Sequence, residues 1–246
     1  MKYLKSNIKK LLIYSGILNS DRVQDGYHFK GHFNSTHSES LNVIKKKSKV
    51  LDFGCYDSSV AEMLVHKKEC IVDGVDENEV GNKNILNNFI KHNLNEGPPK
   101  NNINYSNYDY IIMLDVIEHL DNPEKFIKEL KYLIKENKKI TLIFSTPNIA
   151  FFIIRLSLLF GNFNYAPKGI LDFTHKRLFT FSSFSNLFKK ENFKIIISKG
   201  IPAPFPSVFG ETRLSYMFLK INSLLIKLNK KIFGFQIFFI VKNNLD

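Results

Sequence analysis

Short runs of apolar residues alternate along the chain with segments in which apolar residues recur every three or four positions. The apolar runs, which predict β-strands, span residues 48–53, 70–76, 108–116, 139–146, 194–200 and 235–243. The segments of helical spacing cover residues 58–68, 122–137, 181–193 and 213–231. Strands that alternate with helices build a mostly parallel sheet with helices on both faces. The pattern therefore predicts an α/β fold with a doubly wound sheet.

Two further apolar segments are expected to be helices that do not cross a membrane. Residues 1–20 begin with lysines, but polar and small residues at 14–16 interrupt the apolar run and no cleavage motif follows, so we predict an amphipathic helix and no signal peptide. Residues 149–161 are shorter than the roughly 20 residues that span a bilayer and contain Arg155. We therefore predict no transmembrane segment.

Charge and cysteine content limit the partners and the compartment. The net charge of +12 admits nucleic acid, anionic lipid and acidic substrates. Lysine is in excess along the whole chain, and no stripe interleaves arginine with aromatic residues, so we expect no specific nucleic-acid binding. Cys55 and Cys70 are the only cysteines, which favours a reducing, cytoplasmic location. The helices near 150–160 and 214–228, with lysines beside them, would allow peripheral contact with the inner membrane face. Packing on each other or on a second subunit is favoured over this contact, because the helices are of modest length.

Acidic residues follow two of the predicted strands, at the edge where ligands bind an open parallel sheet. The segment VLDFGCYDSS at 50–59 has a single glycine, Gly54, so it matches neither a dinucleotide fingerprint nor a P-loop. Asp76 ends the next strand about twenty residues later, where an acid can accept hydrogen bonds from both ribose hydroxyls. An acidic residue placed to bind a ribose, without a glycine-rich phosphate-binding loop, predicts a nucleoside-like cofactor that carries no phosphate. This points to S-adenosylmethionine.

Several motifs give the chain a resemblance to a known family. They are VLDFGC, GVD, HNLNEG, YDYIIMLDVIEHLDNP and ITLIFSTPN, in this order over about residues 49–148, with a weaker match in ILDFTHKRLFTFSSF. The chain resembles class I S-adenosylmethionine-dependent methyltransferases, in the subgroup that includes ubiquinone-biosynthesis O-methyltransferases and methyltransferases of surface-glycan clusters. This resemblance implies a Rossmann-like sheet of seven strands with an antiparallel last strand. We predict one domain over residues 1–246, with a helical cap at 1–47, a cofactor half at 48–148 and an acceptor half with helical inserts at 149–246.

The resemblance also implies which residues hold the cofactor. They are Asp52, Gly54, Cys55 and Tyr56 at its amino-acid end, Asp76 and Glu77 at the ribose, Asn93 and Leu94 at the adenine, and Asp115 and Val116 at the sulfonium. Tyr56 and Ser58 stand where the family commonly has glycine. A catalytically degenerate scaffold for polysaccharide biosynthesis is therefore kept as the alternative, because a glycine position often needs a positive φ.

The acceptor residues are expected after the fourth strand and around residues 170–177. His119 is the favoured general base, because histidine is the usual base for a hydroxyl and Glu118 beside it could fix its tautomer. His175 is the second candidate for a catalytic role. The candidate substrate residues are Glu118, Asn148, Asp172 and Arg177.

These observations predict a cytoplasmic methyltransferase that acts on a hydroxyl of a small-molecule or glycan acceptor, either a sugar or a quinol-like compound. A monomer or a homodimer is expected. An RNA methyltransferase is a less favoured alternative, because LDVIEH replaces the motif typical of base methyltransferases. No metal site is predicted: the spacing of His28, His32 and His37 fits no zinc pattern. Mg²⁺ at Glu118, His119 and a distant acid is left open.

Overall fold

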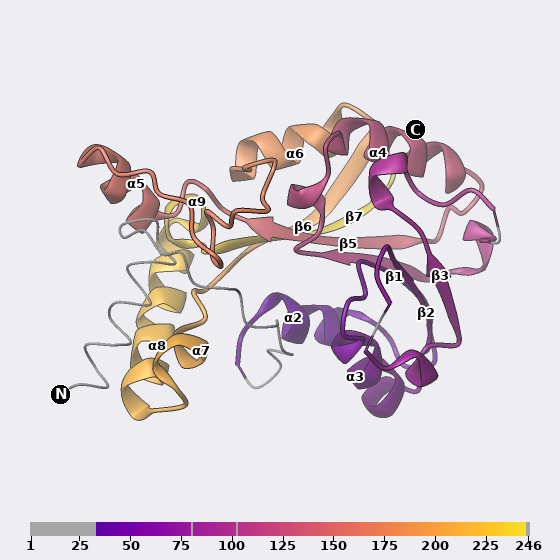
Figure 1. Cartoon of the computed structure of the whole chain (residues 1–246), viewed down its shortest axis with the longest axis horizontal. Helices are drawn as coiled ribbons and strands as arrows, with labels where there is room; N and C mark the ends of the chain where they lie inside the picture. The colour runs from indigo at the N-terminus through magenta and orange to yellow at the C-terminus, as the bar shows by residue number, and fades with distance from the viewer. Residues whose placement is uncertain (1–32, 80, 102, 245–246) are drawn as a thin grey trace.

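A single twisted sheet organises the protein, for which a computed structural model describes residues 33–244 except residues 80 and 102. The helix expected at residues 1–20 lies outside this part. Seven strands follow the order β3-β2-β1-β4-β5-β7-β6 (Figure 1). They are β1 (Lys49–Phe53), β2 (Ile71–Asp76), β3 (Asn88–Lys91), β4 (Tyr110–Leu114), β5 (Thr141–Pro147), β6 (Phe193–Ile201) and β7 (Gln236–Asn243).

The first five strands are parallel, and β7 runs antiparallel to both β5 and β6. The predicted α/β class, the seven-stranded Rossmann-like sheet and its antiparallel last strand are therefore confirmed. The sequence analysis missed β3, because four residues at the edge of the sheet are too few to establish a period.

Helices cover both faces of the sheet. They are α2 (Thr36–Val43), α3 (Ser59–Lys68), α4 (Pro123–Leu133), α5 (Phe152–Leu159), α6 (Phe181–Lys189), α7 (Phe205–Phe209), α8 (Arg213–Leu228) and α9 (Lys230–Phe233). Three predicted helices end earlier than expected. The segment 181–193 is helical only to Lys189. The segment 122–137 is helical only to Leu133, and Asn229 divides the segment 213–231 because its extended backbone ends α8 and its side chain caps α9.

Side-chain caps begin the main helices. Asn122 accepts a hydrogen bond from the Lys125 amide at the start of α4, where Pro123 occupies the first turn. Thr180 and Ser183 form a reciprocal capping box at α6. These local interactions explain why the helices that pack beside the cofactor half begin where the sequence predicts.

The core lies in two layers, one on each face of the sheet. In Figure 1, α4 and α6 lie above the sheet and α2 and α3 below it. Above the sheet, Phe184 of α6 stacks on Phe239 of β7 with ring centroids 5.0 Å apart, and Phe53 of β1 meets Phe126 of α4 edge to face. These buried aromatic pairs fix the helices against the strands whose carboxyl ends form the functional site.

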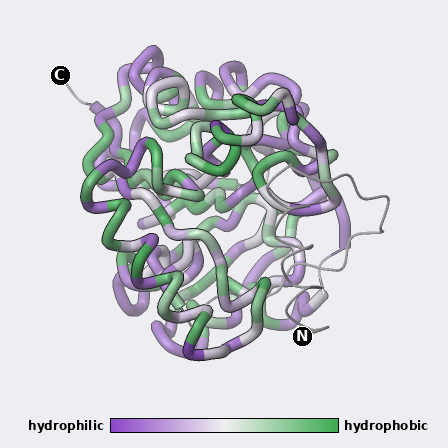
Figure 2. Tube along the Cα trace, turned by 90° about the vertical axis from the view of Figure 1, so that its left-hand side faces the viewer, coloured by the Kyte–Doolittle hydropathy of each residue, from purple (hydrophilic) through white to green (hydrophobic). Residues whose placement is uncertain are grey.

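The elements α5, α7, α8 and α9 gather at one end of the sheet (Figure 1). A small core of Phe151, Ile154, Ile170, Leu171 and Ala203 lies at this end, and Phe152 of α5 and Phe205 of α7 pack against it. Hydrophobic and hydrophilic positions are interspersed along the segments at this end (Figure 2). None of the described helices is long and apolar enough to cross a membrane.

Candidate active site

A cavity of about 930 Å³ opens at the carboxyl ends of β1, β2 and β4. This is the edge where the sheet order reverses between β1 and β4, which is where ligands bind in open α/β sheets. The segments 168–170, 174–176, 203–208 and 235–236 close its other side. Its size is typical of a site for a cofactor together with a small substrate.

The loop after β1 keeps a glycine-like backbone although only one glycine is present. Gly54 has a φ of +75°, and a Cβ there would lie 2.4 Å from Cγ2 of Val116. Tyr56 and Ser58 also have positive φ angles, of 37° and 60°. Left-handed backbone costs a residue with a side chain about 1–2 kcal/mol. The Tyr56 ring is 53% exposed, so it borders the cavity without being buried in it.

Asp76 organises this loop from the end of β2. Its carboxylate accepts a hydrogen bond from the Tyr56 amide at 3.0 Å and another from the Asn78 amide at 2.9 Å. Each carboxylate oxygen has two lone pairs, so each retains capacity for one more donor. Asp76 can therefore hold the loop and a diol at the same time.

Asp52 lies beneath the same loop and is buried. Burial, and secondarily the charges of Asp76 and Asp57, raise the pKa of Asp52 from 3.8 to about 7. Burial and then the charge of Asp52 also raise the pKa of the neighbouring Cys55 thiol, so Cys55 stays a neutral thiol. This end of the cavity is suited to a cationic group, which would offset the repulsion between the carboxylates.

Asp115 follows β4 in a left-handed conformation, with a φ of 55°. Its Oδ1 accepts a hydrogen bond from the Ser145 hydroxyl at 2.7 Å, and its Oδ2 accepts a short hydrogen bond from the Gln236 amide nitrogen. Both Asp115 and Gln236 line the cavity. The carboxylate is thus fixed between the ends of β5 and β7.

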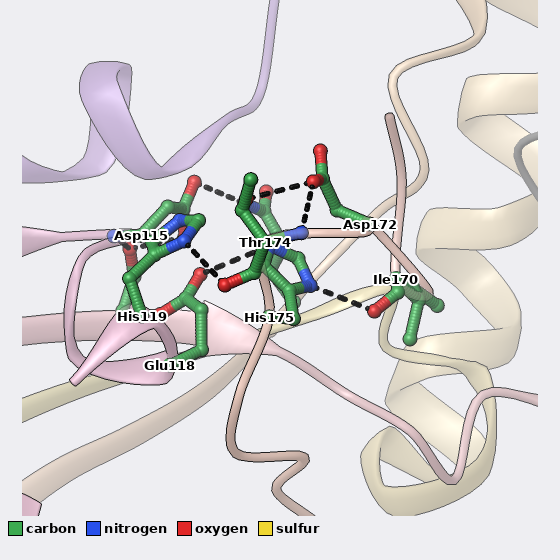
Figure 3. A network of polar contacts seen from close by, with 9 residues as sticks. Asp115, Glu118, His119, Ile170, Asp172, Thr174 and His175 are labelled. Atoms are coloured by element: carbon green, nitrogen blue, oxygen red, sulfur yellow. Dashed lines mark hydrogen bonds and ion pairs between the residues drawn. The ribbon is translucent and has the colours of Figure 1, made fainter. Parts of the chain in front are cut away.

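Glu118, His119 and His175 lie together at one side of the cavity (Figure 3). Burial, and then the charge of Asp115, hold the pKa of Glu118 well above its usual range. Thr146 lies near enough to lower that pKa slightly but outside hydrogen-bond geometry, so neither carboxylate oxygen has a hydrogen-bond partner among the described residues. Glu118 is therefore protonated more readily than an exposed glutamate.

The two imidazoles have defined tautomers. His119 Nδ1 lies 3.1 Å from the Thr174 carbonyl oxygen, and His175 Nδ1 lies 2.8 Å from the Ile170 carbonyl oxygen. A carbonyl only accepts, so each Nδ1 carries the proton and each Nε2 is left as the acceptor. Burial and then the neighbouring His175 lower the pKa of His119, which keeps it neutral at neutral pH.

One ligand atom from each of Glu118, His119 and His175 lies within 4.8 Å of the others, a spacing that one metal ion could bridge. Two imidazoles and one carboxylate suit zinc or iron, whereas Mg²⁺ prefers oxygen ligands. The donor set therefore does not fit the Mg²⁺ that the sequence left open. The absence of a metal stays a prediction.

Apolar side chains form the wall opposite these polar groups. They come from the 151–153, 170 and 203–208 segments and from the start of β7, and they include Phe151, Ile153, Ile170, Phe205, Val208 and Phe235. Such a wall would exclude water from a bound acceptor and favour one that carries an apolar group.

Most of the predicted site residues line this one cavity. They are Asp52, Gly54, Cys55, Tyr56, Asp76, Glu77, Asn93, Leu94, Asp115, Val116, Glu118, His119 and His175. They converge because each follows a strand whose end lies at the same edge of the sheet, or lies in the loop that covers it.

Three predicted substrate residues, Asn148, Asp172 and Arg177, lie outside the cavity lining. Asn148 is fully buried, and its amide donates to the carbonyls of Lys231 and Gly234. Asp172 is buried as well and accepts from the amide and hydroxyl of Thr174. Arg177 forms an ion pair with Glu124. Their polar groups contact the loops around the cavity, and a role for these residues at the acceptor stays a prediction.

The sequence analysis missed Ser145 and Gln236, which hold Asp115, and Thr174, which orients His119. Ser145 did lie in the STPN motif, but a single serine at a strand end carries no signal of its partner. Gln236 belongs to the last strand, and nothing in its local sequence indicates that it reaches β4.

Comparisons with known proteins agree with this geometry. The family model described as "Methyltransferase domain" matches residues 30–198. The ubiquinone biosynthesis O-methyltransferase of Coxiella burnetii is 29% identical over 178 residues, which cover 63% of this chain and 71% of that protein.

Solved structures share the fold at low identity. A SAM-dependent methyltransferase from Archaeoglobus fulgidus superposes with a TM-score of 0.50 at 18% identity, over 84% of this chain and 90% of that one. A TehB-like SAM-dependent methyltransferase from Corynebacterium glutamicum gives 0.51 at 10% identity, over 85% and 87% of the two chains.

Proposed function

The chain belongs to the methyltransferase-domain family, and we propose on this basis that it transfers a methyl group from S-adenosylmethionine to a hydroxyl of a small acceptor with an apolar part. A quinol-like acceptor is favoured, and a sugar hydroxyl is the alternative. The observation that carries the hydroxyl chemistry is the tautomer of His119, which leaves a neutral Nε2 as proton acceptor on a residue that lines the cavity.

The residues at the β1 and β2 ends fit the proposed cofactor. S-adenosylmethionine, when bound, supplies an electrophilic methyl group on a positively charged sulfur. Asp76 retains two acceptor positions for the ribose hydroxyls, and Asp52 can face the cationic amino group. Tyr56 and Ser58, which stand where the family commonly has glycine, have the positive φ angles that glycine adopts readily. This fit favours a cofactor-binding enzyme over the degenerate scaffold.

His119 would act as general base on the acceptor hydroxyl. Its Nδ1 is held by the Thr174 carbonyl, so the ring is oriented before the acceptor arrives. Burial lowers its pKa, and a neutral imidazole is the form that takes a proton. The buried Glu118 and the imidazole of His175, whose ring centroid lies 4.9 Å from that of His119, would confine the ring to this position.

The C. burnetii relative supports the quinol-like acceptor by its name. The apolar wall around Phe151, Ile170 and Phe205 points in the same direction, because a sugar has few apolar groups to place there.

Methyl transfer to a catechol or hydroquinone and to sugar acceptors, measured with labelled S-adenosylmethionine, tests the proposal. His119→Asn is expected to lower kcat by about 100-fold or more and to leave cofactor affinity within about twofold. His66→Asn, which changes an exposed histidine on α3, is the matched control. An unchanged kcat in His119→Asn would refute the role of His119 as general base. If titration of the wild type with millimolar cofactor releases no heat, the non-catalytic scaffold is favoured.

The apolar end of the molecule fits peripheral contact with an anionic membrane. Leu159, Phe160 and Leu228 are exposed there, and the basic Arg155 and Lys227 flank them. Basic groups beside apolar ones match the charge of anionic lipid, and the adjoining cavity wall would receive an acceptor from it. Sedimentation with phosphatidylglycerol vesicles, but not with phosphatidylcholine vesicles, is expected. Binding to both, or a dimer that covers this end, would refute the contact.

The two free cysteines accord with a cytoplasmic location, and we retain a monomer or a homodimer as the proposed state.

A further inference from the structure

The carboxylate of Asp115 is held by two neutral donors from different strands. The Ser145 hydroxyl of β5 donates to Oδ1 at 2.7 Å, and the Gln236 amide of β7 donates to Oδ2. Ser145 is fully buried and Gln236 is nearly so, so water cannot readily replace either donor. Neutral donors orient a carboxylate without cancelling its charge.

The backbone of Asp115 is constrained as tightly as its side chain. Its amide donates to the carbonyl oxygen of Ser145 at 3.2 Å and to the Ser145 hydroxyl at 3.0 Å. The residue is nevertheless left-handed, with a φ of 55°. A non-glycine residue keeps such a conformation only where its surroundings over-determine it, and these positions cluster at functional sites.

The charge of Asp115 is directed to the cavity and is not used in an ion pair. Among the described residues, no lysine or arginine lies within 4.0 Å of its carboxylate. Asp115 follows β4, which lies beside β1, and it lines the same cavity as Asp52, Asp76 and His119. A reacting group that bridges the proposed cofactor and acceptor positions would pass beside it.

We propose that Asp115 is the residue by which the cavity distinguishes the positively charged methyl donor from its uncharged product, and that Ser145 and Gln236 are positioning residues for its carboxylate. The inference rests on the proposed placement of the cofactor. Loss of the methyl group turns the sulfonium into a neutral thioether, so the attraction to Asp115 disappears when the reaction is complete. The same carboxylate then contributes to capture of the donor and to release of the product.

The effect of Asp115 is therefore a difference between two ligands that otherwise make the same contacts. A carboxylate near a cation in a partly buried site attracts it by an amount that corresponds to about tenfold in affinity or more. Asp115→Asn preserves the shape and the hydrogen-bonding capacity for Ser145, and it removes the charge. Asp115→Asn is expected to lower the affinity for S-adenosylmethionine by about tenfold and the affinity for S-adenosylhomocysteine by less than about twofold.

Calorimetric titration of the whole protein with each of the two ligands, at one pH and two salt concentrations, measures this difference. Gln236→Met removes the donor to Oδ2 without touching the charge, and Ser145→Ala removes the donor to Oδ1. Both are expected to change the affinity ratio in the same direction as Asp115→Asn, by less. Asp121→Asn is the matched control, because it removes an exposed carboxylate from the same loop outside the cavity lining.

A selective loss of donor affinity in Asp115→Asn, together with an unchanged ratio in Asp121→Asn, supports the inference. An equal loss for both ligands, or the same change in the control, overturns it. If Asp115→Asn does not fold, the ratio of the two ligand affinities in Gln236→Met tests the inference instead. Binding of the neutral product to that variant shows that its site is intact. The assay contains no acceptor, so a wrong acceptor leaves this inference standing, whereas a wild-type protein that binds neither ligand refutes it together with the proposed cofactor.

Discussion

Replacing the buried Asp52 by asparagine is expected to stabilise the protein at alkaline pH and to weaken the binding of the proposed cofactor. Burial and the neighbouring carboxylates raise the pKa of Asp52 from 3.8 to about 7. An acid whose pKa is higher in the folded state stabilises the fold at low pH, and that contribution is lost as pH rises through the folded-state pKa. Asparagine cannot ionise, so it avoids the loss.

The magnitude follows from the two pKa values. Each pKa unit corresponds to about 1.4 kcal/mol, so the full effect above pH 7 is about 4 kcal/mol as an upper limit. Between pH 5 and pH 8, the stability difference between Asp52→Asn and the wild type should grow by about 3 kcal/mol. Other groups titrate equally in both proteins, so they cancel in this difference.

Urea unfolding at several pH values gives the free energies of unfolding for both proteins, and Glu136→Gln, at an exposed carboxylate, serves as the control. The control should show no such dependence on pH. A constant difference between Asp52→Asn and the wild type from pH 5 to pH 8 would refute the raised pKa. Added S-adenosylmethionine should stabilise the wild type more than Asp52→Asn, because the ionised carboxylate faces the cationic amino group in the proposed complex.

Further predictions concern the base, the strained loop, the buried Asn148 and metals. The kcat of the wild type should fall in acid, at a pH below the ordinary pKa of a histidine, because burial lowers the pKa of His119; a flat pH profile would contradict its role as base. Tyr56→Gly should relieve the positive φ and raise the free energy of unfolding by up to about 1 kcal/mol, measured in urea; a loss would show that the ring contributes more than the strain costs. Asn148→Ala should destabilise the fold by about 1–3 kcal/mol with an unchanged KM for the acceptor, and an altered KM would instead support its predicted role at the substrate. Treatment with a chelator should leave activity unchanged, whereas Zn²⁺ should inhibit by occupying the Nε2 atoms of His119 and His175; lost activity after chelation would refute the metal-free prediction.

The cofactor half of the site could be predicted because its residues are tied to strand ends. Asp76 ends β2, Asp115 directly follows β4, and Asp52 is the last residue but one of β1. Parallel neighbours bring those strand ends to one edge. The order of elements alone therefore determined that the three carboxylates share a cavity. The same logic failed for β3, whose four residues give no measurable period.

The acceptor half depended on contacts between distant segments. Thr174 meets His119 across 55 residues, and Gln236 meets Asp115 across 121. No local pattern encodes such pairs, since they exist only after the loop at 170–177 and the antiparallel β7 have packed against the parallel strands.

The sequence by itself thus determined the α/β class and the edge of the sheet that carries the chemistry, because periodicity and strand order are local properties. Only the tertiary structure decided which polar groups face the cavity. Asn148 and Asp172 follow or adjoin promising motifs, yet their side chains satisfy buried backbone groups instead. A buried donor or acceptor must find a partner, and the identity of that partner is decided by the packing of the whole chain.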